Sequence, residues 1–304
     1  MLSTTRSLIR ASKAIYPKPT PRALLNRARF IKAAIPHRDL ALQVINAPQH
    51  TALAEMYAQR PGIVGVVVWP YICAAWDAKE RLRHVIDHYT VIDQLGPPFP
   101  FLTLERLVLV ELDAIHPQLR LVLDQPRWFL REGGLTLNLF VAQFRAYSIA
   151  YAYQNLPDGT RAIYIGSLQG RDTEDSMDIY RDLTKSLHGM RPRDFLLHAL
   201  QTFAKETGVS QIYAVADEQR HHRHPYFGGK TITGDYNAIW EDRGGTRINA
   251  HFYQLPLIPE RRDIDTIKSK KKNLYRKRYE FLDQFESQLA TNLPRCTPVQ
   301  FVDL

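Results

Sequence analysis

The distribution of apolar and polar residues divides the chain into a helical first part and a strand-rich second part. Residues up to about 92 predict helices over 22–34, 41–59 and 78–89. The Pro-rich segment 17–21 separates these from any helix that begins at the N-terminus. Gly62–Trp69 instead predicts a strand, because Val and Ile dominate it.

The pattern changes after the linker Gly96-Pro97-Pro98-Phe99-Pro100. Short β-rich runs then alternate with turn residues, and Asn155–Gly159 is typical of a hairpin turn. The predicted strands are 107–112, 119–123, 135–140, 148–154, 162–168, 212–216, 235–240 and 248–255.

Three helices are predicted among and after these strands. Helix 172–187 has acidic residues in its first turn, and helix 192–207 has Pro192 in its first turn and Gly208 after its end. A last helix over 264–289 places apolar residues on one stripe. We therefore predict an α+β protein with a helical N-terminal part followed by a mostly antiparallel sheet with flanking helices.

The excess of positive over negative charge lies in two short segments. The chain has a formal net charge of +9, yet Met1–Arg38 holds nine basic residues and no acidic one, and 260–278 has a net charge of +6. Residues 39–259 carry a net charge of −3. We predict a basic N-terminal arm (1–38), a helical region (39–95), a core domain (101–259), a basic amphipathic helix (260–290) and a tail (291–304).

The two basic segments, Met1–Arg38 and Lys268–Arg278, are expected to contact an anionic partner. The candidates are the phosphates of CoA or tRNA, or an anionic membrane surface. The oligomeric state is left open.

Composition and topology exclude several classes of protein. Two cysteines, Cys73 and Cys296, are too few for a secreted disulfide scaffold. The longest apolar run, Gly62–Ala75, is 14 residues long and too short to span a bilayer. The N-terminus lacks the apolar segment and cleavage site of a secretory signal. We expect a cytoplasmic protein, with peripheral association with the inner membrane or organelle import as alternatives.

Several motifs of the second half resemble the VirK/YbjX family of bacterial proteins. They are His188-Gly189-Met190-Arg191-Pro192-Arg193, Leu168-Gln169-Gly170, Asp235-Tyr236-Asn237-Ala238-Ile239-Trp240, Gly244-Gly245, Phe252-Tyr253-Gln254-Leu255-Pro256 and the basic run Ser269–Tyr279. The resemblance covers residues 40 to 290. It implies a bacterial protein linked to virulence and envelope stress, but it supplies no reaction.

Two turns before helices are candidate anion sites, because free N–H groups and arginines bind phosphate there. One contains Gln169, Gly170 and Arg171, and the other contains Gly189, Arg191 and Arg193. A strand, turn, helix and strand in this order resemble the core of GCN5-like acyltransferases, where the turn holds the pyrophosphate of acyl-CoA. The usual Gln/Arg-x-x-Gly-x-Gly/Ala pattern is absent, and an extra helix intervenes. The alternative is that the arginines pair with carboxylates and the glycines only turn the chain.

Three residues are candidates for catalysis. His188 could act as a general base or cap a helix, while Asp235 and Tyr236 open a predicted strand and could supply a base and an acid. His221-His222-Arg223-His224 predicts a mobile polar loop rather than a metal site, and His84 and His88 lack the glutamate of a His-Glu-x-x-His enzyme. No metal is expected, and the cofactor is unknown, with acyl-CoA as the candidate.

Two hypotheses result. The first is an acyl- or aminoacyl-transferase that uses acyl-CoA or aminoacyl-tRNA as donor and an amine as acceptor. The second is a non-catalytic envelope-stress protein that binds a membrane surface or a partner protein through its two basic segments.

Overall fold

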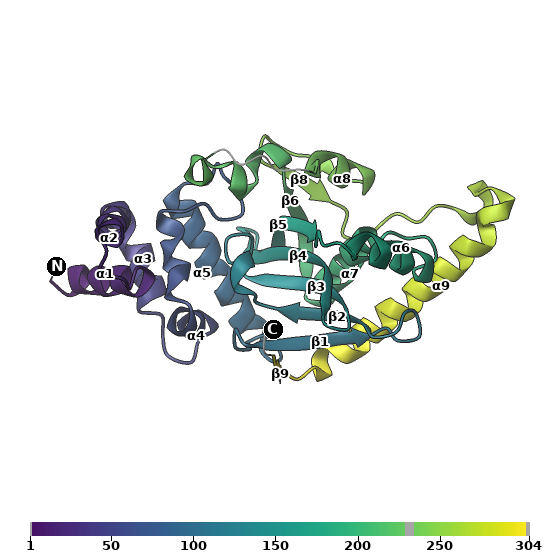
Figure 1. Cartoon of the computed structure of the whole chain (residues 1–304), viewed down its shortest axis with the longest axis horizontal. Coiled ribbons are helices and arrows are strands. Elements are labelled where there is room, and N and C mark those ends of the chain that lie inside the picture. The colour runs from purple at the N-terminus through teal and green to yellow at the C-terminus, as the bar shows by residue number, and fades with distance from the viewer. Residues whose placement is uncertain (1, 229–233, 302–304) are drawn as a thin grey trace.

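The computed structural model of the chain describes residues 2–228 and 234–301. Within these residues a single sheet has the strand order β7-β8-β6-β5-β4-β3-β2-β1-β9 and lies between helices (Figure 1). The strands are β1 Glu105–Glu111, β2 Leu119–Asp124, β3 Leu135–Val141, β4 Phe144–Asn155, β5 Arg161–Gly170, β6 Val209–Val215, β7 Thr246–Arg247, β8 Phe252–Leu255 and β9 Val299–Gln300.

Helices form the N-terminal part, and helices also lie in the connections β5–β6, β6–β7 and β8–β9 (Figure 1). They are α1 Leu2–Ile15, α2 Pro21–Ala34, α3 Arg38–Ile45, α4 Ala52–Gln59, α5 Ala78–Leu95, α6 Ser176–Ser186, α7 Pro192–Glu206, α8 Tyr236–Asp242 and α9 Ser269–Asn292. The prediction of an α+β chain with a mostly antiparallel sheet is confirmed, since β5–β6 is the one parallel pair among the described strands.

Helices α5 and α7 cover opposite faces of the sheet. His84 of α5 contacts the ring of Tyr164 in β5, whereas Phe203 of α7 contacts Tyr151 in β4. Tyr164 pairs with Ala152, the residue after Tyr151. Because side chains alternate along a strand, the two tyrosines point to opposite faces. The strands between them are therefore buried on both sides, and the run Ile149–Tyr153 is fully buried.

The predicted strand at Gly62–Trp69 is wrong, because Pro61–Val67 forms a 3₁₀ helix. Its aliphatic residues are buried, so the Val and Ile content reflects burial rather than pairing in a sheet. A Cβ atom on Gly65 would lie 2.0 Å from the Trp69 ring, which shows how tightly this helix packs on its own continuation.

The predicted strand at Asp235–Trp240 is also wrong, because these residues begin helix α8. The Asp235 side chain accepts a hydrogen bond from the Ala238 N–H at 3.0 Å and caps the helix. Two predicted elements are interrupted: 41–59 divides into α3 and α4, and 248–255 retains only β8. The acidic helix begins at Ser176 rather than at 172.

The N-terminal helices share the core of the sheet. Leu8 and Ala11 of α1 and Phe30 and Ala34 of α2 are buried in the same hydrophobic cluster as the strands. Of the predicted arm, Met1 lies outside the described residues, as do 302–304 of the predicted tail. Among the described helices, none combines the length and apolar character required to cross a bilayer.

Candidate functional site

Strands β5 and β6 separate at their carboxyl ends. Their pairing ends at Ile165 and Ala214, while β5 continues to Gly170. The phenol of Tyr236 fills the gap: it accepts a hydrogen bond from the Leu168 N–H at 2.8 Å and donates one to the Leu168 carbonyl at 3.0 Å. Diverging ends of parallel strands are where α/β sheets place ligands, so this edge is the natural location of a site.

A buried carboxyl lies beside this divergence. Glu132, on the turn before β3, has 4% of its surface exposed and accepts a hydrogen bond from the Gln169 side-chain amide at 2.8 Å. Burial raises its pKa to about 7, although Ser167, Arg220 and Gln169 oppose this rise. A carboxyl with a pKa near 7 exchanges its proton readily at neutral pH, as a general base must.

Two histidines face the same carboxyl. The Nε2 atoms of His221 and His222 lie 3.6 Å and 3.8 Å from Glu132 Oε1. His221 is buried, so the prediction of a mobile polar loop is wrong at this residue. Burial lowers the pKa of His221 to about 2, and His222, Arg131 and Arg220 add to this effect. The imidazole is therefore neutral at physiological pH.

The donor atoms of Glu132, His221 and His222 lie within 4.8 Å of one another and could hold a divalent cation. Two arginines oppose that use. Arg131 and Arg220 both act on His221 electrostatically, and Arg220 also acts on Glu132. Both positive charges repel a cation, whereas the charge of Arg220 stabilises the carboxylate form of Glu132. The arrangement therefore suits acid–base chemistry better than metal binding.

No motif in the sequence predicts Glu132 as a site residue. The only sequence feature that marks its surroundings is a pair of glycines, Gly133 and Gly166. A Cβ atom on Gly133 would lie 2.4 Å from the Tyr151 nitrogen, and one on Gly166 would lie 2.0 Å from the Glu132 carbonyl oxygen. These two glycines allow the turn that carries Glu132 to press against β4 and β5. Glycines at such positions indicate close backbone approach, but they do not reveal that a neighbouring carboxyl is buried.

A cleft of about 1180 Å³ opens next to this cluster, between the N-terminal helices and the end of the sheet. Its walls include both histidines of the cluster. The remaining lining is rich in arginine and aromatic residues, among them Arg60, Arg127, Arg131, Tyr16, Trp69, Trp128, Tyr226, Phe227 and Phe301.

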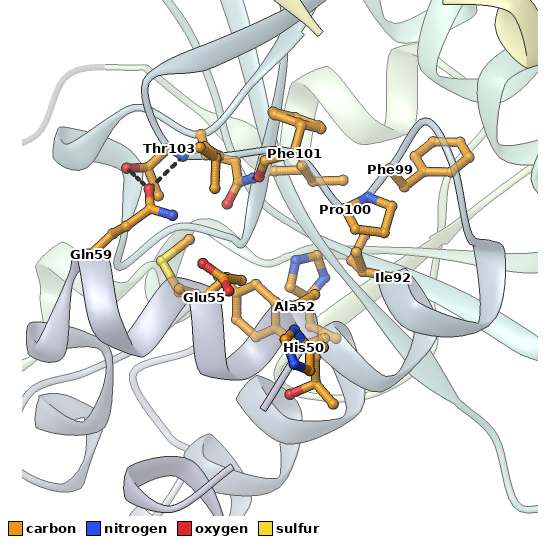
Figure 2. A pocket seen from close by; sticks show the side chains of 16 residues that line it. His50, Ala52, Glu55, Gln59, Ile92, Phe99, Pro100, Phe101 and Thr103 are labelled. Atoms are coloured by element: carbon orange, nitrogen blue, oxygen red, sulfur yellow. Dashed lines mark hydrogen bonds between the residues drawn. The ribbon is translucent and has the colours of Figure 1, made fainter. Parts of the chain in front are cut away.

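A second cavity of about 70 Å³ lies between α4, α5 and the segment 99–103 (Figure 2). Figure 2 shows Gln59 turned toward Thr103, whose N–H and hydroxyl donate to the Gln59 amide oxygen at 2.8 and 2.7 Å. The cavity is too small for a cofactor, and we assign it a packing role.

The structure brings only some of the predicted site residues to Glu132. Gln169 contacts it directly, and Tyr236 lies one strand residue away on Leu168. Burial raises the pKa of Tyr236 to about 12, so its phenol keeps its proton. Asp235, by contrast, is engaged as the cap of α8.

His188 lies elsewhere, at the connection between α6 and α7. Its carbonyl accepts two hydrogen bonds from the Arg278 guanidinium of α9, at 2.8 and 3.1 Å, and its ring contacts Phe281. His188 and Gly189 both have positive φ, 52° and 75°, which turns the chain between the helices. The catalytic role of His188 stays a prediction.

Tyr147 lies near both of the turns that are predicted to bind phosphate, the one with Gly170 and Arg171 and the one with Arg191 and Arg193. A Cβ atom on Gly170 would lie 2.8 Å from the Tyr147 ring, and the Arg171 N–H donates to the Ala146 carbonyl. Burial raises the pKa of Tyr147, and the charges of Arg193 and Arg191 oppose this rise.

The two arginines differ in their partners. Arg193 pairs with Asp194 at 3.3 Å, and Arg243 shares that carboxylate. Arg191 is exposed. Phosphate binding at these turns stays a prediction, and the ion pair means that part of their charge is already balanced.

Comparisons with known proteins agree on one family. A family model described as "Protein of unknown function (DUF535)" matches residues 20–291. The chain is 30% identical over 274 residues to "Uncharacterized protein YbjX" of Escherichia coli (strain K12), which is 87% of this chain and 82% of that protein. It is 32% identical over 122 residues to an uncharacterized protein of Haemophilus influenzae, covering 40% of this chain and 41% of that protein. No solved structure matches.

Proposed function

The chain belongs to the DUF535 family, and we propose that it is an acyl- or aminoacyl-transferase in which Glu132 is the general base. The resemblance of the motifs to the VirK/YbjX family is confirmed by these relatives. Family membership names no reaction, so the proposal depends on the site. The proposal assigns the general base to Glu132 rather than to His188 or Asp235. His188 lies away from the β5–β6 divergence, and the Asp235 side chain caps helix α8.

One observation carries the proposal: a buried carboxyl with a pKa of about 7 lies where the parallel strands part, beside a large cleft. The topology adds support. An antiparallel sheet that continues through one parallel pair, joined by helices α6 and α7, has the strand–turn–helix–strand order of GCN5-like transferases. The second helix in the connection is the difference from that pattern. Fold likeness alone is weak support for an activity, so Glu132 is the stronger argument.

The chemistry follows from the protonation state of Glu132. Its carboxylate accepts a proton from the acceptor amine while the amine nitrogen attacks the carbonyl carbon of the donor. The new C–N bond forms as the C–S bond of a thioester, or the C–O bond of an ester, breaks. The proton held by Glu132 then returns to the leaving sulfur or oxygen. Gln169 is a positioning residue, because its amide holds one Glu132 oxygen at 2.8 Å.

The test is transfer by purified protein from labelled acetyl-CoA and leucyl-tRNA to an amine-bearing peptide, with products identified by mass spectrometry. Glu132→Gln is nearly isosteric and cannot accept the proton, so we expect transfer to fall about 10²- to 10⁴-fold. Glu111→Gln, at an exposed position in β1, is the matched control. Equal rates for Glu132→Gln and the wild type, or no transfer with either donor, would overturn the proposal. Metal analysis of the same protein separates acid–base from metal-assisted chemistry.

A second candidate function, binding to an anionic membrane surface, is favoured by the N-terminal helices. Leu24, Leu25 and Ile35 expose 54%, 51% and 57% of their surface in a segment that holds nine basic residues and no acidic one. Exposed apolar side chains among lysines and arginines are typical of peripheral membrane binding. This function agrees with the envelope-stress role that the family resemblance implies, and it is compatible with the transferase proposal.

A further inference from the structure

Arg131 lies in the wall of the large cleft, and aromatic rings surround its guanidinium group. The Arg131 guanidinium lies 4.9 Å from the ring centre of Trp69, 5.0 Å from Tyr226 and 5.2 Å from Phe227. These cation–π contacts fix the group in place while leaving its N–H donors directed to other partners. Among the described residues, no carboxylate forms an ion pair with Arg131.

Two acidic residues, Asp124 and Glu105, also line the cleft, and neither forms an ion pair with Arg131. The Glu105 carboxylate accepts a hydrogen bond from the Leu102 N–H at 2.7 Å. The Asp124 carboxylate is already engaged, by Arg145 at 2.7 Å and by Asn138 at 2.9 Å. Arg127 is exposed and also lines the cleft. An anion that enters the cleft therefore meets a fixed guanidinium whose planar fork matches a phosphate.

Flat apolar surfaces stand beside that charge. Trp128 and Tyr226 line the cleft and expose 52% and 46% of their surface. Large aromatic side chains left open in a cleft provide flat surfaces on which planar rings such as nucleic-acid bases stack. A volume of about 1180 Å³ accommodates a ring system together with its sugar and phosphate.

We propose that this cleft binds a nucleoside monophosphate unit, with its phosphate on Arg131 and its base stacked on the exposed rings of Trp128 and Tyr226. A nucleoside monophosphate unit is present both in CoA and in the 3′ end of an RNA. The inference rests on the proposed function, because it names the part of the donor that the cleft holds. It also assigns to Arg131 the phosphate contact that the sequence predicts for Arg191 and Arg193.

The cleft and the proposed base adjoin one another. His221 and His222 line the cleft and lie within 4 Å of Glu132, and Arg131 precedes Glu132 in the chain. The nucleotide site and the proposed base therefore lie in the same part of the molecule, with His221 and His222 between the cleft and the Glu132 carboxyl.

The experiment measures binding without turnover, by calorimetry and tryptophan fluorescence on the full chain. AMP is the probe, and adenosine and inorganic phosphate are its two fragments. We expect AMP to bind at least tenfold more tightly than either fragment. Arg131→Gln and Trp128→Ala should each weaken AMP binding at least tenfold, whereas Arg191→Gln, at an exposed arginine of the predicted turn, should leave it unchanged. Circular dichroism and melting curves verify that each variant is folded.

Further arms identify the source of the nucleotide. Tighter binding of CoA than of AMP supports the inference with CoA as donor, and tighter binding of a CCA trinucleotide supports it with RNA as donor. Absence of AMP binding to the wild type, or equal binding by Arg131→Gln, would overturn it. Glu132→Gln should keep full AMP affinity, so a loss of transfer with intact binding separates the two proposals. Transfer activity in a protein that does not bind AMP would refute the cleft assignment alone.

Discussion

The Glu132 carboxyl carries a cost in stability that follows from its burial. A carboxylate is less stable in a buried site than in water, which is why the pKa rises from 4.5 to about 7. Its partners, Gln169 and the nearby Arg220, offset only part of this penalty. Residues whose environment works against stability in this way are common at functional sites, because function retains them.

This burial predicts a specific pH dependence of folding. A carboxyl with a higher pKa in the folded than in the unfolded state binds its proton more tightly when folded, so the protein loses stability as pH rises from about 4.5 to about 7. We expect Glu132→Gln to remove this component and to be the more stable protein at pH 8, by up to ~3 kcal/mol. Urea unfolding of both proteins at pH 5 and pH 8 measures it. If the free energy of unfolding changed with pH in the same way in both proteins, the raised pKa of Glu132 would be contradicted.

Individual site residues were predictable only where a local motif marked them. Their motifs predict Gln169 and Tyr236 as site residues, and both lie at the β5–β6 divergence. Glu132 is not predicted, because it becomes special only when distant strands bury it. His221 was misassigned for the same reason: four consecutive polar residues predict a loop, and only the fold shows that one of them is buried.

At the scale of elements, the sequence predicts those helices and strands whose position depends on the local pattern of apolar and turn residues. The strands from β1 to β6 and helix α7 agree with their predicted positions to within a few residues. The errors occur at Pro61–Val67 and at α8, where composition and tertiary packing conflict. In α8 the hydrogen bond from the Ala238 N–H to the Asp235 side chain stabilises the start of a helix, although the residues that follow favour a strand.

Helix α2 carries a prediction about membrane association. Replacing Leu24 and Leu25 by Gln removes two exposed apolar side chains while leaving every basic residue in place. We expect sedimentation with vesicles of phosphatidylglycerol and phosphatidylethanolamine to fall at least several-fold. Ile258→Gln, at a residue that is 72% exposed in another part of the chain, is the control. If the double variant binds as the wild type does, Leu24 and Leu25 make no contact with the membrane, whereas absence of vesicle binding by the wild type would refute the second function.

At the scale of the whole molecule, one long helix connects distant parts of the chain. Helix α9 runs past α7 to β1, the strand next to the edge strand β9, where the Asn292 amide donates to the Leu109 carbonyl at 3.1 Å (Figure 1). Its Phe281 and Phe285 pack on Phe195 of α7. The basic residues of this helix are partly used internally, since Lys272 pairs with Asp265 and Arg278 binds the His188 carbonyl.

Because α9 covers part of the hydrophobic core, shortening one of its buried side chains should destabilise the entire protein. Phe285 is 1% exposed, and we expect Phe285→Ala to lower the free energy of unfolding by ~3–5 kcal/mol. Leu274→Ala, in the same helix at a residue that is 39% exposed, should cost far less. Urea denaturation of the two variants measures the difference. Similar losses for both would show that α9 does not contribute its buried face to the core.

The late position of α9 in the chain also matters for biosynthesis. Translation proceeds from the N-terminus at ~5–20 residues per second, so α7 leaves the ribosome several seconds before α9 does. During that interval Phe195 lacks both of the aromatic rings that cover it in the finished protein. The nascent chain therefore exposes the face of α7 that carries Phe195 until α9 is made, and such exposed apolar surface makes a folding intermediate prone to aggregation.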